Sequence, residues 1–238
     1  HAVSMRSQAN DAGSVRSKPT DGAEHPNLFG AGMLCRRSSV RIQKTAIIGN
    51  TIDADQMGNR AAKLEDGVDT PGDRTTNGVG SADMAPDEAR GGGLYFADCT
   101  VEIAGSTIQA NEGYCAGLAR GGGIYCERSR MRMWRSRVTD NALRASVSKG
   151  AGIYFKDPLG CELGGSVITG NGACAGLEAY ASGMPPASAV WRNGTGGGIY
   201  IEGDSARVAI HRNTAVRQNH PDDVYPVKGS QVPFGKER

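Results

Sequence analysis

The sequence predicts an all-β protein, a right-handed parallel β-helix of about five coils with three short strands per coil and two loop insertions. The first observation behind this prediction is a repeat. Five times the chain places a glycine cluster before an aliphatic residue, and about twenty residues later it closes with Ser/Thr-x-Ile/Val-x-x-Asn. The closing asparagines are Asn50, Asn111, Asn141, Asn171 and Asn219. A repeat of this length indicates units that bury their apolar faces against one another.

The second observation is the alternation of residue types within each repeat. After the glycines, apolar residues occupy every second position, as in Ile124 and Cys126 or Ile153 and Phe155. This period of two is typical of a strand with one buried face. The residue between them therefore points outward, and in four repeats it is a tyrosine. The four are Tyr95, Tyr125, Tyr154 and Tyr200.

The third observation concerns charge in the second predicted strand. Its outward position alternates in sign through four repeats, with Arg41, Glu102, Arg132 and Glu162. If the repeats stack in order, each charge faces its opposite at about 4.8 Å, a cross-strand pairing that favours this register. The closing asparagines would then form a hydrogen-bonded ladder along the stack, because identical Asn side chains at strand spacing pair in this way.

These patterns divide the chain into regions. We expect an N-terminal arm or cap over residues 1–29, the β-helix over 30–225, and a C-terminal tail over 226–238. Two segments interrupt the repeat, residues 54–90 and 172–195, and are expected to be loop insertions on one side of the stack.

The glycine–aliphatic opening and the hydrophobic-x-x-Asn closing resemble the repeats of chlamydial polymorphic outer-membrane proteins. More broadly they are similar to the pectin-lyase-like β-helix superfamily. The resemblance covers roughly residues 30–225. It implies a parallel β-helix, and it implies several functions, among them polysaccharide lyases and hydrolases, adhesins and structural proteins.

Composition excludes some classes and leaves others open. The formal net charge of +2 makes nucleic acid an unlikely partner, and no run of apolar residues is long enough for a transmembrane helix. The first residue is His1 rather than Met, so we expect a processed chain, with an organelle lumen, the periplasm and the extracellular space all open. The register separates Cys35 from Cys126 by two strand steps, so mostly free thiols are expected among the six cysteines.

No pattern in the sequence marks a catalytic or metal site, and we expect no cofactor. Asp222–Asp223 beside His220 could be an acid/base pair, but a polar turn explains them better. Acids in the first insertion, Asp66, Asp69 and Asp73, could bind calcium, but they lack EF-hand spacing and suit a solvated loop. A basic cluster could bind a polyanion or form a solvated face. It comprises Arg128, Arg130, Arg132, Arg135 and Arg137.

The tyrosine strip is the most functional-looking surface, because exposed apolar strips mark contacts. It could meet a protein partner or a glycan, or it could be covered by the arm or an insertion. We therefore expect a non-catalytic scaffold that docks partner proteins within a larger assembly. The alternatives are a polysaccharide-binding or pectate-lyase-like protein, and a fragment of a surface adhesin or autotransporter passenger.

Overall fold

The computed structural model describes residues 28–53, 88–115, 117–175, 194–226 and 234–235. Within these ranges nearly every regular element is a short β-strand, every strand pairing is parallel, and no α-helix is present. A 3₁₀ turn, Ser205–Arg207, directly precedes the strand β22 (Val208–His211). The chain is therefore all-β, and its parallel sheets are compatible with a parallel β-helix.

The strands form five parallel sheets, called here A to E in the order in which the chain first visits them. Sheet A contains β1 (Leu28–Phe29), β6 (Glu88–Arg90), β11 (Leu118–Arg120) and β16 (Val147–Lys149). Sheet B contains β2 (Met33–Arg36), β7 (Leu94–Ala97), β12 (Ile124–Glu127), β17 (Ile153–Lys156), β21 (Ile199–Glu202) and β24 (Val224–Tyr225).

The other three sheets follow the same order. Sheet C contains β3 (Ser39–Gln43), β8 (Thr100–Ala104), β13 (Arg130–Trp134), β18 (Cys161–Gly164), β22 (Val208–His211) and β25 (Phe234–Gly235). Sheet D contains β4 (Ala46–Ile48), β9 (Thr107–Gln109), β14 (Arg137–Thr139), β19 (Val167–Thr169) and β23 (Ala215–Arg217). Sheet E contains β5 (Thr51–Asp53), β10 (Glu112–Tyr114), β15 (Ala142–Ala145) and β20 (Gly172–Ala175).

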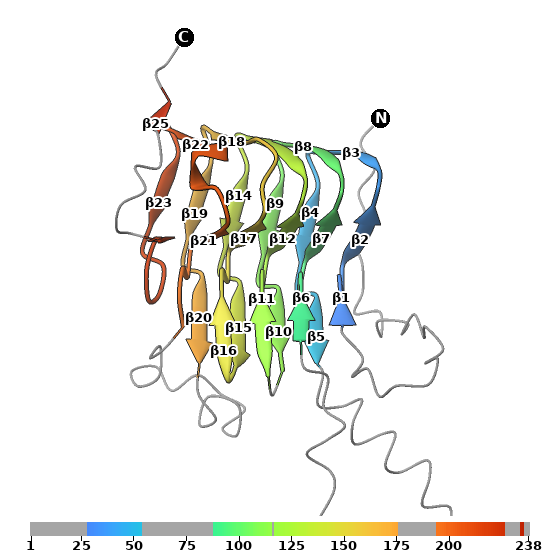
Figure 1. The fold of residues 1–238 in the computed structure, drawn as a ribbon, viewed down its shortest axis with the longest axis vertical. Helices are drawn as coiled ribbons and strands as arrows, with labels where there is room; N and C mark the ends of the chain where they lie inside the picture. The colour runs from blue at the N-terminus through green and yellow to red at the C-terminus, as the bar shows by residue number, and fades with distance from the viewer. Residues whose placement is uncertain (1–27, 54–87, 116, 176–193, 227–233, 236–238) are drawn as a thin grey trace, which may run out of the picture.

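Each strand pairs with the equivalent strand of the neighbouring repeat, so corresponding residues lie side by side (Figure 1). Tyr125, for example, pairs with Tyr95 on one side and with Tyr154 on the other. This register places like residues in columns along the stack. Residues at equivalent positions of the repeats are therefore neighbours in the structure.

The strands of the structure differ from the sequence prediction in their number and in where some of them lie. The prediction of three strands per repeat is wrong, because the first four repeats each contribute a strand to all five sheets. Two paired strands lie in the ranges expected as insertions, β6 within 54–90 and β20 within 172–195. The expected arm and tail also contain paired strands, β1 and β25. These strands were missed because they are short and carry no long alternation.

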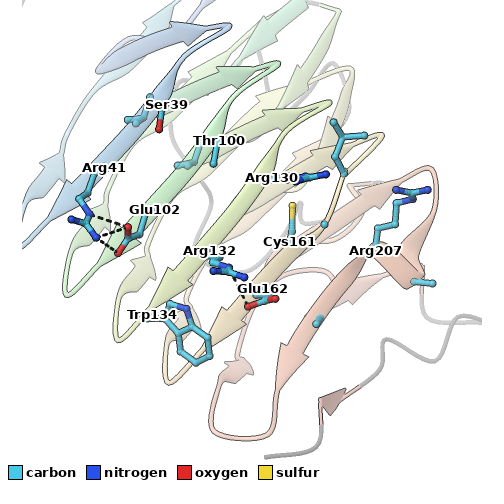
Figure 2. Close-up of a pocket in the computed structure, with 16 residues that line it drawn as sticks. Ser39, Arg41, Thr100, Glu102, Arg130, Arg132, Trp134, Cys161, Glu162 and Arg207 are labelled. Carbon is cyan, nitrogen blue, oxygen red and sulfur yellow. Dashed lines mark hydrogen bonds and ion pairs between the residues drawn. The ribbon is translucent and has the colours of Figure 1, made fainter. Parts of the chain in front are cut away.

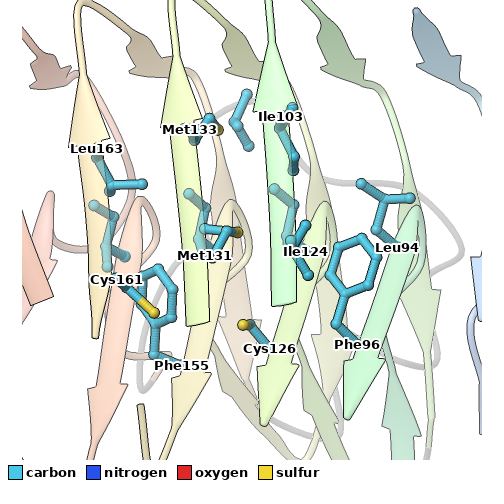
Figure 3. Packing of buried hydrophobic residues seen from close by; sticks show 14 of the residues in the cluster. Leu94, Phe96, Ile103, Ile124, Cys126, Met131, Met133, Phe155, Cys161 and Leu163 are labelled. Atoms are coloured by element: carbon cyan, nitrogen blue, oxygen red, sulfur yellow. The ribbon is translucent and has the colours of Figure 1, made fainter. Parts of the chain in front are cut away.

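The main apolar core lies between sheets B, C and D, where the inward side chains of neighbouring repeats pack together (Figure 3). Leu94, Phe96 and Ile124 are fully buried there. None of the six cysteines, all of which lie in the described ranges, forms a disulfide. Phe96 stands between Cys35 and Cys126 in the register, as the spacing argument required.

The glycine clusters have a steric cause. A Cβ on Gly123 would lie 2.7 Å from the Gly152 carbonyl oxygen and 3.0 Å from Asn141 Nδ2. Gly121 has φ of +64°, a left-handed conformation that glycine adopts without strain. The repeat therefore needs glycine both to bend the chain and to let the next repeat approach.

Candidate functional site

The tyrosine column lies on the outer side of sheet B, and its rings stack face to face. Ring centroids are 5.1 Å apart for Tyr95 and Tyr125, and 5.2 Å apart for Tyr125 and Tyr154. The stack continues through Tyr200 to Tyr225 with separations of 5.2 and 4.9 Å. Parallel register at strand spacing produces this geometry directly, because each ring repeats one strand step from the last.

Cations from sheet A lie over these rings. The Arg90 guanidinium carbon is 5.6 Å from the Tyr125 centroid, that of Arg120 is 5.4 Å from Tyr154, and Lys149 Nζ is 5.1 Å from Tyr200. Each distance is within the range of a cation–π contact. The sequence carries a signal for this arrangement, because each of these cations directly precedes a glycine cluster.

Buried carboxylates form ion pairs with the cations that lie between sheets A and B. Glu88 bonds to both Arg90 and Arg120. Glu127 lies 3.4 Å from Lys156 Nζ and also pairs with Arg128. Burial alone would raise the pKa of Glu127, but the surrounding cations, Lys156 first, outweigh it and hold the pKa below its ordinary value.

The tyrosine strip is therefore not exposed to solvent. The side chains of Tyr95, Tyr125, Tyr154 and Tyr200 are between 0 and 9 % exposed, so a partner could not stack on them. Burial raises the pKa of the Tyr125 and Tyr154 hydroxyl groups, which keeps both protonated. The physical reason for the correction is the neighbouring sheet A, whose side chains fold over the outward face of sheet B.

The five closing asparagines form a hydrogen-bonded column, which is buried from Asn111 to Asn219. In the middle of it, Asn111 Nδ2 donates to Asn141 Oδ1 at 2.9 Å, and Asn141 Nδ2 donates to Asn171 Oδ1 at 2.8 Å. The same pairing joins Asn50 to Asn111 and Asn171 to Asn219. At the C-terminal end, Asn219 Nδ2 and the Asn219 backbone amide both donate to Asp223 Oδ1. Asp223 thus ends the column.

An open groove of about 980 Å³ crosses the outer face of sheet C (Figure 2). Its central row contains the four alternating charges. Arg41 Nε donates to Glu102 Oε2 at 2.9 Å, and Arg132 Nε lies 3.5 Å from Glu162 Oε2. The side chains of the first pair are 66 and 42 % exposed, so these charges are presented to solvent.

Two further rows flank the charged row. One follows the first residue of each strand and includes Thr100 and Arg130, which are neighbours in register. The other includes Trp134, whose ring lies across the outer position of Gly164 and packs on His211 at 5.0 Å. A Cβ on Gly164 would lie 1.8 Å from Trp134 Cζ3, so only glycine permits this ring position.

The remaining predicted residues do not gather into a site. Asp223 is occupied with the asparagine column, which fits the turn interpretation of Asp222–Asp223 better than an acid/base pair. Within the basic cluster, Arg128 pairs with Asp98 and Arg132 pairs with Glu162. The acids Asp66, Asp69 and Asp73 lie outside the described residues.

Over the described ranges, no three His, Cys, Asp or Glu side chains are grouped so that they could hold a metal ion. The same part of the chain contains no helix of the length and apolarity needed to cross a membrane. No protein-family model matches the chain, and no curated protein or solved structure matches it.

Proposed function

We propose that the five sheets wind as a right-handed parallel β-helix of five coils, belonging to the pectin-lyase-like group. Three features support this winding: sheets that pair strands one repeat apart, a single asparagine column, and inward side chains that share one core. Connections between parallel strands of one sheet are right-handed in nearly all proteins. A crystal structure with left-handed connections, or with sheets around separate cores, would contradict the proposal.

We further propose that the chain is a non-catalytic scaffold that docks a partner protein on the outer face of sheet C. The groove described above is the observation that carries this proposal. It presents charged side chains in rows at strand spacing, whereas the tyrosines are covered. Its lining includes four arginines and two glutamates, which favours a partner with an acidic contact segment.

The exposed charges of the groove contribute little to the fold. Exposed ion pairs such as Arg41 with Glu102 stabilise a protein by about 0.2–1 kcal/mol. Arg130, also exposed, has no acidic partner among the described residues within ion-pair distance. Charges that stabilise so little are available for recognition, where they set the orientation and rate of encounter.

Cross-linking in cells that make the protein, followed by affinity capture, tests the docking surface. The variant Arg130→Glu/Arg132→Glu should lose proteins that the wild-type chain captures. A matched control, Arg137→Glu/Arg217→Glu, changes the same charge on exposed residues of sheet D and should keep them. Capture that both variants retain, or no cross-linked neighbour at all, would refute docking through sheet C.

Glycan binding is the second candidate, and Trp134 favours it. Because one ring face covers Gly164, the opposite face is turned toward the groove, where its negative potential suits the C–H groups of a sugar. Titration with polygalacturonate, with and without calcium, tests this candidate through Trp134 fluorescence. No change in the wild-type signal, or an equal change in Arg132→Ser and wild type, would argue against binding in the groove.

A further inference from the structure

One row of the groove has a hydrogen-bond donor, and no acid, at each of its polar positions. It follows the residues at the start of the sheet C strands, and Ser39, Thr100 and Arg130 are aligned in register. The row continues through Gly160 and Arg207, which directly precede the paired residues Cys161 and Val208. Hydroxyl and guanidinium groups thus follow the stack, and Figure 2 shows Arg130 and Arg207 on either side of one end of the groove.

Between the two arginines lies Gly160, which directly precedes the strand β18. Backbones two strand steps apart are separated by roughly 9.6 Å. Gly160 has no neighbouring atom within 4 Å of the position that a Cβ would take, so the space between the arginines is open. Leu159 adjoins it and is 47 % exposed. The row therefore pairs two cations with an apolar contact between them.

This spacing distinguishes among peptide conformations. Acidic residues on one face of an extended strand recur at about 6.6–6.8 Å, which is shorter than the two strand steps between these rows of the backbone. A polyproline II helix has three residues per turn and a rise of about 3.1 Å, so one face recurs at about 9.3 Å. Its carbonyl groups have no internal partners, and hydroxyl donors such as those of Ser39 and Thr100 suit them.

We propose that the row binds a proline-rich acidic segment of the partner protein in the polyproline II conformation, with an acidic residue at every third position. One carboxylate contacts Arg130 and the next contacts Arg207, while the residues between them pack on Leu159. This inference rests on the proposed docking function of sheet C. An α-helix satisfies its own backbone and would leave the hydroxyl groups of the row unused.

Asp204 competes for one of the two arginines. Arg207 Nε lies 3.2 Å from Asp204 Oδ2, and the other Asp204 oxygen accepts from the Ala206 amide at 3.0 Å. Both members of the ion pair are exposed. Asp204→Asn keeps an acceptor for Ala206 but removes the charge, so it should tighten binding of the acidic segment.

Fluorescence anisotropy with labelled peptides and the whole chain tests the inference. One peptide repeats Glu-Pro-Pro, and a second places the same number of glutamates at every second position. We expect the first to bind about threefold to tenfold more tightly, and Arg130→Ser or Arg207→Ser to weaken it by a similar factor. Arg217→Ser, an exposed arginine on sheet D, should leave its affinity unchanged.

Equal affinity for the two peptides would overturn the polyproline II assignment, as would tighter binding of a helical peptide with acids seven residues apart. Tighter binding of polygalacturonate would assign the row to a glycan. If Arg130→Ser had no effect on the peptide, the row would not be its site. These failures are separable from failure of the docking function, because capture of a cross-linked partner could still depend on Arg130 and Arg132.

Discussion

Replacing Asn141 by alanine tests how much the asparagine column stabilises the stack. The substitution removes four hydrogen bonds. Asn141 Oδ1 accepts from the Asn111 backbone amide and from Asn111 Nδ2, at 3.0 and 2.9 Å. Asn141 Nδ2 donates to the Ile108 carbonyl and to Asn171 Oδ1, at 3.1 and 2.8 Å. All of these groups are buried, so water does not replace the lost partners.

The expected loss follows from that count. At about 0.5–1.5 kcal/mol net for each hydrogen bond, Asn141→Ala should lower the free energy of unfolding by about 4 kcal/mol. Asn50→Ala is the matched control at the end of the column, because among the described residues it removes only the bond from Asn50 Nδ2 to Asn111 Oδ1. By the same measure, it should destabilise by about 1 kcal/mol.

Urea unfolding followed by circular dichroism and Trp fluorescence gives both free energies, and agreement of the two probes checks that unfolding is cooperative. A loss for Asn141→Ala within 0.5 kcal/mol of that for Asn50→Ala, roughly the limit of independent-site additivity, would refute the reasoning. Asn141→Asp gives a second check. The introduced carboxylate would face the Asn171 and Ile108 oxygens, so its pKa should rise and the variant should regain stability as the pH falls.

Three further outcomes follow from burial and charge. Tyr125→Ala should lower the free energy of unfolding by about 3–5 kcal/mol, since the ring is fully buried. Tyr225 is 36 % exposed, so Tyr225→Ala should lower it far less when both variants are measured by thermal unfolding. Because the pKa of Glu127 is depressed in the folded chain, its stabilisation is present above about pH 4.3 and is lost as the pH falls through the folded value. Glu127→Gln should therefore destabilise at pH 7 and converge on wild type in acid, and a constant difference would contradict this. Burial, with Cys99 nearby, raises the pKa of Cys35, so its alkylation rate should reach half-maximum above about pH 8.5, and a lower midpoint would show a more solvated thiol.

The sequence predicted the stacking register because the repeat places like residues at like positions. Alternation around Ile124 and Cys126 requires one buried face, and a slip of one residue would turn both toward solvent. The charge pairs followed from the same register, and Arg41 does contact Glu102. What alternation could not predict were strands of two or three residues, such as Leu28–Phe29, because two positions define no period.

The alternation of inward and outward positions could not predict by itself whether the tyrosine column is exposed. Alternation gives the face of the sheet on which a residue lies. Whether that face is exposed to solvent depends on the angle to the next sheet. Sheets A and B meet so that Arg90 and Arg120 lie over the rings of Tyr125 and Tyr154. The cation before each glycine cluster indicates locally that the rings are covered, but it can be interpreted in this way only when sheet A is known.

The row that begins the strands of sheet C differs from the rest of the stack in one respect that bears on function. Inward positions and the asparagine column repeat the same residue types, because every repeat packs against its neighbours in the same way. The outer row does not repeat: its hydroxyl groups lie toward the N-terminal repeats, and Arg130, Gly160 and Arg207 lie toward the C-terminal repeats. Packing imposes no such gradient on exposed residues. A ligand along this row would therefore bind in one direction and one register, which a uniform repeat could not specify.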